Sequence, residues 1–98
     1  MRRDEVIEQL KQHEADIRAL GAASLYLYGS HARDEAREDS DVDLFFDRDP
    51  DRRISLMELI ELKFFAEQIL GTEVDIGTRT SLHPVLKPEI ERSALRIF

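Results

Sequence analysis

The stretch that decides the fold runs from Gly29 to Asp47 and reads Gly-Ser-His-Ala-Arg-Asp-Glu-Ala-Arg-Glu-Asp-Ser-Asp-Val-Asp-Leu-Phe-Phe-Asp. Its second half alternates along an extended chain, with Val42, Leu44 and Phe46 on one side and Asp41, Asp43, Phe45 and Asp47 on the other. We therefore predict a strand over 41–47 that turns one apolar face to a core and presents carboxylates on its other face.

Helical and extended patterns alternate on both sides of this strand. The predicted elements, in chain order, are a helix over 3–20, a strand over 24–28, a short helix over 31–36, the strand over 41–47, a helix from Asp49-Pro50 to Leu70, a strand over 73–77, a helix from Pro88 to Ala94 and an edge strand over 95–98. Gly21 and Gly71 are expected to end the two long helices. This order predicts a small α/β (α+β) fold with helices packed on a mixed sheet.

Composition limits the classes of function. The 98 residues suit one domain over 1–98, and the formal net charge of −7 disfavours direct binding to nucleic-acid backbones. No cysteine is present, which excludes disulfides, thiolate catalysis and cysteine zinc sites. No apolar run approaches the roughly 20 residues of a membrane helix, and charged residues follow Met1-Arg2-Arg3 where a signal peptide would be apolar. We expect a cytoplasmic protein without membrane contact.

The spacing Asp41-x-Asp43 places two carboxylates on one strand face. Ionised carboxylates so placed repel each other unless a cation lies between them, and such oxygen ligands suit Mg²⁺ or Mn²⁺. Asp75 is a third candidate, because it lies opposite its apolar neighbours; if its strand pairs with the strand over 41–47, it could share a metal and help deprotonate a hydroxyl. Each carboxylate alone also fits an ordinary solvated strand face.

Gly29-Ser30 lies where a strand turns into a helix. Glycine lets a ligand approach the backbone, and free N–H groups at the helix start favour phosphate. Arg33 has two interpretations of equal weight, phosphate binding or a surface ion pair with a neighbouring carboxylate. Other nearby side chains are expected to be structural: His31 exposed in a turn, Tyr26 and Tyr28 in the core, and Asp47 on the strand.

Taken together, these motifs resemble the minimal nucleotidyltransferase domain of the DNA polymerase beta superfamily. The resemblance rests on Gly29-Ser30-x-Ala32-Arg33, Ser40-Asp41-x-Asp43-Leu44 and Val74-Asp75-Ile76, and it spans most of the chain. It implies that Gly29, Ser30 and Arg33 bind the nucleotide, that Asp41, Asp43 and Asp75 are catalytic metal ligands, and that two Mg²⁺ ions (or Mn²⁺) act with ATP as substrate. The chain departs from the family at Asp34, where glycine is usual.

By its size, the chain resembles the family members that act as antitoxins. These transfer AMP from ATP to a tyrosine of a HEPN-domain ribonuclease toxin. The resemblance therefore implies a protein adenylyltransferase in a hetero-oligomer with such a toxin. Two alternatives stay open: a non-catalytic module that masks its partner electrostatically, and a nucleotidyltransferase that acts on a small molecule. Catalysis requires Mg²⁺ and a nucleotide, whereas masking requires neither.

Overall fold

The computed structural model describes residues 1–37 and 39–98; Glu38, within the polar run that precedes the carboxylate strand, lies outside that part. The elements it contains are α1 (Arg3–Gln12), α2 (Glu14–Ala19), β1 (Ala22–Tyr28), α3 (Gly29–Ala32), β2 (Val42–Arg48), α4 (Leu56–Leu70), β3 (Val74–Thr78), the 3₁₀ helix η1 (Arg79–Ser81), α5 (Lys87–Ser93) and β4 (Leu95–Arg96). The predicted mixed α/β fold is confirmed. No helix in these two ranges is long and apolar enough to cross a membrane.

The four strands form one sheet in the order β3-β2-β1-β4. β1 pairs antiparallel with both β2 and β4, whereas β2 and β3 run parallel. A parallel pair needs a long crossover, which α4 supplies here. The pairing that would bring Asp75 close to Asp41 and Asp43 is therefore present, and the predicted edge strand near the C-terminus is confirmed.

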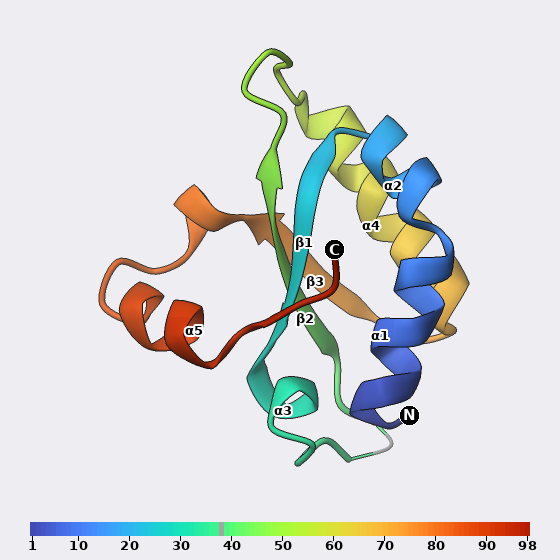
Figure 1. Cartoon of the computed structure of the whole chain (residues 1–98), viewed down its shortest axis with the longest axis vertical. Coiled ribbons are helices and arrows are strands. Elements are labelled where there is room, and N and C mark those ends of the chain that lie inside the picture. The colour runs from blue at the N-terminus through green and yellow to red at the C-terminus, as the bar shows by residue number, and fades with distance from the viewer. Residues whose placement is uncertain (38) are drawn as a thin grey trace.

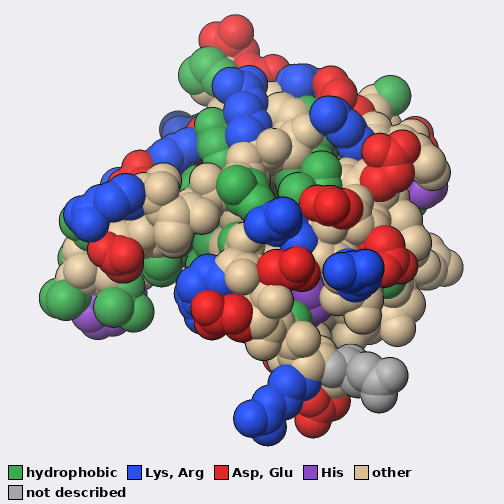
Figure 2. Space-filling view, turned by 60° about the horizontal axis from the view of Figure 1, so that its bottom comes forward, with side chains coloured by type: hydrophobic (Ala, Val, Ile, Leu, Met, Phe, Trp, Pro, Cys, Tyr) green, Lys and Arg blue, Asp and Glu red, His purple; other side chains and the backbone are tan. Residues whose placement is uncertain are grey.

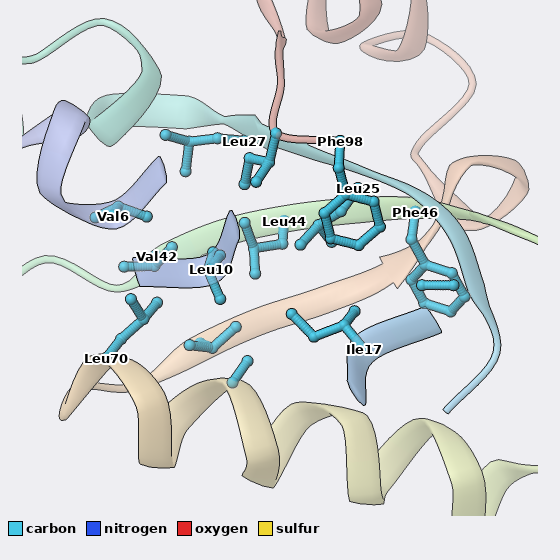
Figure 3. Packing of buried hydrophobic residues seen from close by; sticks show 14 of the residues in the cluster. Val6, Leu10, Ile17, Leu25, Leu27, Val42, Leu44, Phe46, Leu70 and Phe98 are labelled. Carbon is cyan, nitrogen blue, oxygen red and sulfur yellow. The ribbon is translucent and has the colours of Figure 1, made fainter. Parts of the chain in front are cut away.

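One face of the sheet carries the core. Figure 1 shows α1, α2 and α4 together on one side of the strands, while α5 stands away on the other side. The side chains that fill this layer come from the apolar positions of every strand and from the helix faces opposite them, as Figure 3 shows for Val6, Leu10, Ile17, Leu25, Leu27, Val42, Leu44, Phe46, Leu70 and Phe98. The opposite face carries the carboxylates of β2 and β3 together with the aromatic rings of Tyr26, Tyr28 and Phe45.

The predicted helix over 3–20 is wrong in one respect, because it is two helices. His13 separates them: its backbone N–H donates to the carbonyl of Leu10 at 3.1 Å, a tighter turn than the α-helical one. The ring of His13 also donates from Nδ1 to the carbonyl of Gln9 at 2.9 Å. This local side-chain bond competes with the helical pattern.

The beginning of α4 also differs from its prediction at Asp49-Pro50. Ser55 caps the helix, since its hydroxyl accepts from the N–H of Glu58 at 3.1 Å while the Glu58 carboxylate accepts from the N–H of Ser55 at 3.3 Å. Asp49 instead accepts from the N–H of Asp51 at 2.9 Å and forms a turn. A reciprocal capping box thus prevails over the Asp-Pro signal six residues earlier.

Substitution of Phe46 tests whether the buried layer between the sheet and the helices stabilises the fold. It is fully buried, so Phe46→Ala should lower the free energy of unfolding by about 3–5 kcal/mol. Phe64 provides the control, because it is 60% exposed and its change to alanine should cost no more than about 0.5 kcal/mol. Urea unfolding of both variants measures the difference, and similar losses would contradict this assignment of the core.

Candidate active site

We call the face of the sheet that α1, α2 and α4 do not cover the open face. Its side chains form rows that run across the strands. In one row, Asp43 on β2 pairs with Tyr28 on β1 and with Asp75 on β3. Register partners lie side by side on the same face of a sheet. Asp41 lies two residues before Asp43, just ahead of β2. The structure therefore brings the three predicted carboxylates to the same end of the open face.

Electrostatic coupling shows how close these carboxylates are. The pKa of Asp43 is raised, first by burial and then by the negative charges of Asp75 and Asp41. The positive charge of Arg33 acts in the opposite direction and does not cancel the rise. The pKa of Tyr28 is raised as well, by burial and by Asp43 and Asp75. This end of the sheet has an excess of negative charge.

Gly29 begins α3 directly after β1 and lies against Asp43. Its φ is +75°, a conformation that disfavours side chains. A Cβ atom at this position would also overlap the Asp43 carboxylate. The first N–H groups of a helix have no acceptors within the helix. The turn at Gly29 and Ser30 thus presents free backbone donors next to a carboxylate, without a side chain to obstruct a ligand.

Arg33 and Asp34 follow at the end of α3. Arg33 is exposed and donates from Nε to Glu35 at 3.2 Å, which is the ion pair that the sequence allowed. Asp34 has φ +58°, and this explains why glycine is usual at its position. Its carboxylate accepts from the backbone N–H of Arg3 at 3.4 Å, so it interacts with the first turn of α1.

The structure corrects two of the structural assignments. His31 is not exposed: it is 2% accessible, and burial lowers its pKa although a hydrogen bond with the Asp41 backbone acts in the opposite direction. Tyr26 and Tyr28 are not in the core, because they point to the open face and pack on Phe45; the Tyr26 ring stacks on it at 4.8 Å. The alternation of side chains along β1 predicts this orientation of the two tyrosines, since Leu25 and Leu27 occupy the core positions.

Arg79 of η1 is a residue that sequence reasoning missed. It donates two bonds to Asp47, at 2.7 and 2.9 Å, and a third to Glu91 at 2.7 Å. Its guanidinium also lies over the rings of Tyr26 and Phe45. These contacts lower the pKa of Asp47 and support its structural assignment. No local pattern predicts them, because Arg79 and Asp47 are 32 residues apart.

The donor set at this end of the sheet fits a divalent cation. Its ligands are carboxylate oxygens, and their mutual repulsion would be relieved by a positive charge. Within the described residues, no group of three His, Asp or Glu side chains converges enough to hold a metal alone. Mg²⁺ commonly binds one or two carboxylates and takes its other ligands from water and substrate phosphates. A site that a nucleotide completes is consistent with both observations.

Comparisons with known proteins find relatives of the chain among nucleotidyltransferases. The sequence profile of the nucleotidyltransferase domain matches residues 3–97. The chain is 35% identical to the protein adenylyltransferase MntA of Thermococcus cleftensis over 94 residues, which cover 95% of this chain and 89% of the relative. A solved structure described as a minimal nucleotidyltransferase superposes with a TM-score of 0.82 and 32% identity, covering 97% of this chain and 95% of that one.

A more distant structure shares the fold. It is the complex of an MNT antitoxin with a tri-AMPylated HEPN toxin from Shewanella oneidensis, with a TM-score of 0.66 and 16% identity. The superposition covers 94% of this chain and 71% of that one.

Substitution of Gly29 tests its contact with Asp43. Gly29→Ala and Gly71→Ala both force a side chain into positive φ, at a cost of about 1–2 kcal/mol each. At Gly71 no atom lies within 4 Å of the new Cβ, whereas at Gly29 the Cβ meets the carboxylate. We expect the larger loss of unfolding free energy at Gly29, measured by urea titration. Equal losses would show that the carboxylate moves aside freely.

The pH dependence of stability tests the charge excess. The folded-state pKa of Asp43 is raised, so the folded chain binds more protons than the unfolded chain, and stability falls as the pH rises through that pKa. Asp43→Asn should therefore raise Tm in metal-free buffer at pH 7, with the gain vanishing below the ordinary pKa of 3.8.

Asp47→Asn is the matched control, for which we expect Tm to change in the opposite direction. The pKa of Asp47 is lowered by the hydrogen bonds from Arg79, so its ionised form stabilises the fold above the ordinary pKa and loses that contribution in acid. This variant should have a lower Tm than the unmodified chain at pH 7. Tm of both variants is measured by circular dichroism. A change of Tm in the same direction in both would refute the distinction between the two carboxylates.

Proposed function

The chain belongs to the nucleotidyltransferase domain family, and we propose that it transfers AMP from ATP to a tyrosine hydroxyl of a HEPN-type toxin, as that toxin's antitoxin. The observation that carries the proposal is the row in which Asp43 and Asp75 are direct register partners, with Asp41 two residues away and the open turn at Gly29 beside them. We infer that this arrangement would bind a phosphate and a cation side by side.

Each residue has a role in this proposal. Asp41 and Asp43, with Asp75 as the third carboxylate, would hold divalent cations, most simply two Mg²⁺ ions or Mn²⁺ in their place. Bound there, such ions neutralise the charge of the triphosphate. The backbone N–H groups at Gly29 and Ser30 donate to phosphate oxygens. Arg33 is placed to assist, since its charge already acts on Asp43.

The reaction balances without another cofactor. The acceptor oxygen forms a bond to the α-phosphorus of ATP as the bond from that phosphorus to the oxygen bridging to the β-phosphate breaks. Pyrophosphate leaves on the side opposite the attacking oxygen. The hydroxyl proton passes to a carboxylate oxygen of Asp75, the third member of the site. AMP then remains linked to the acceptor oxygen.

The relatives and structural neighbours of the chain support a HEPN-type toxin as its partner. The relative MntA is a protein adenylyltransferase, and an MNT antitoxin that shares this fold forms a complex with an AMPylated HEPN toxin. We also propose that residues 1–98 act as one domain, and that another protein supplies the acceptor hydroxyl. The departure at Asp34 does not weaken this proposal, since its carboxylate is bonded to the first turn of α1.

Mass spectrometry provides the test. A HEPN-type toxin from the same organism is incubated with the chain, ATP and Mg²⁺, and the intact mass of the toxin is measured. We expect one or more AMP-sized increments that need the metal. Asp41→Asn should reduce the rate by at least about a hundredfold, as loss of a key electrostatic group does in other enzymes. Asp47→Asn, on the same strand face, should retain transfer if folded.

The other outcomes identify the alternatives. Tight binding and inhibition without a mass change, equally strong for Asp41→Asn, would assign the chain to the masking class. Consumption of ATP that follows an added small hydroxyl compound, with the protein partner unmodified, would assign it to small-molecule transfer. Transfer from another nucleoside triphosphate in preference to ATP would correct the choice of AMP.

A further inference from the structure

A pocket of about 310 Å³ lies next to Asp75 on the open face of the sheet. Its lining comes from β1, β3 and the segment that follows β3, and comprises Tyr28, Asp75, Ile76, Gly77, Ser81, Leu82, His83, Leu86 and Ile90. We refer to residues 79–94, which contain η1 and α5, as the C-terminal arm. The arm forms the outer wall of the pocket, and the strands form its floor.

The arm is held in place by polar contacts, because none of the residues of α5 is buried. Arg79 connects it to the sheet, with Asp47 on one side and Glu91 on the other. The Ser81 hydroxyl donates to the carbonyl of Thr78 at 2.7 Å and packs closely over Gly77. Figure 1 shows the arm projecting from the body of the molecule, and Figure 2 shows hydrophobic side chains gathered at its tip.

The pocket lies on the side of the carboxylates where an acceptor must enter. The turn at Gly29 adjoins Asp43 from β1, whereas the pocket includes Asp75 of β3, on the other side of Asp43, and the arm that extends from β3 over Tyr28. In-line transfer requires the attacking oxygen and the leaving pyrophosphate to be on opposite sides of the α-phosphorus. If pyrophosphate leaves toward Gly29, the acceptor approaches from the pocket.

The size and lining of the pocket favour a side chain over a nucleoside. Ligand pockets span about 300–1,000 Å³, and this one is at the lower limit. Its wall carries apolar groups from Leu82, Leu86 and Ile90, which suit a ring. Its polar groups come from Asp75, Tyr28, Ser81 and His83, which suit a hydroxyl. The neighbouring aromatic surface of Tyr26 and Phe45 is not free for a base, because Arg79 already covers it at 4.8 and 4.9 Å.

We propose that this pocket binds the acceptor tyrosine, with Leu86 and Ile90 contacting its ring and its hydroxyl directed to Asp75. The inference rests on the proposed function and adds the residues that determine acceptor specificity. It also gives the arm a role: the exposed apolar residues at its tip, Val85 and Leu86, contact the partner chain around the tyrosine.

Kinetics of a matched pair of variants test the assignment. Leu86 lines the pocket and is 55% exposed, whereas its neighbour Val85 is 78% exposed and lies outside the lining, so neither change should disturb folding. Leu86→Ala should raise the KM for the HEPN-type acceptor about tenfold or more, the effect of removing methylene groups from an apolar pocket, and leave the KM for ATP unchanged. Val85→Ala should leave the KM for ATP unchanged and have the smaller effect on the acceptor.

A binding measurement separates this inference from the proposed function. N-acetyl-tyrosinamide, titrated into the ¹⁵N-labelled chain without ATP, should shift the amide signals of Gly77, Ser81 and Ile90, while ATP with Mg²⁺ should shift those of Gly29 and Ser30. Shifts at the pocket without transfer by the unmodified chain would support the pocket and refute the activity.

Three results would overturn the pocket assignment. The first is transfer by the unmodified chain together with equal acceptor KM values for Leu86→Ala and Val85→Ala. The second is a rise in the KM for ATP in Leu86→Ala, which would assign the pocket to the nucleobase. The third is the absence of shifts at the pocket up to the solubility limit of the tyrosine probe.

Discussion

The parallel pairing of β2 with β3 is the constraint on which the open face depends. Through it Asp75 becomes the register partner of Asp43, although the two residues are 32 positions apart in the chain. A shift of one residue would turn Asp75 to the core and Val74 or Ile76 to the carboxylates. The apolar alternation of both strands prevents this shift, so the packing of the core fixes the geometry of the site.

The two faces of the sheet differ in composition because the helices cover one of them. α1, α2 and α4 all cover one face, and their apolar side chains complete the core there. Among the described residues, the other face is covered in part by the C-terminal arm, which ion pairs hold above it. Because most of the hydrophobic stabilisation comes from the helix-covered face, the other face can carry neighbouring carboxylates at a tolerable cost in stability.

The sequence predicts the features that depend on strand periodicity, and it fails where single hydrogen bonds or the packing of separate segments decide. The alternation in β2 gives the strand and both of its faces, and the apolar neighbours of Asp75 give its side. The break at His13 and the start of α4 at Ser55 escape prediction, because single hydrogen bonds override the helical pattern there. Burial of His31 and the contacts of Arg79 escape it too, since both depend on how separate segments pack.

Two carboxylates on one strand have opposite electrostatic environments. Asp43 and Asp47 lie on the same face of one strand, four residues apart, yet their environments oppose each other. Asp47 receives two bonds from Arg79 and one from Ser24, and its pKa is lowered; Asp43 has carboxylate neighbours, and its pKa is raised. A fold selected for stability alone would pair both. Carboxylate repulsion that is relieved at one position and kept at its neighbour is the electrostatic pattern on which the proposed cation site rests.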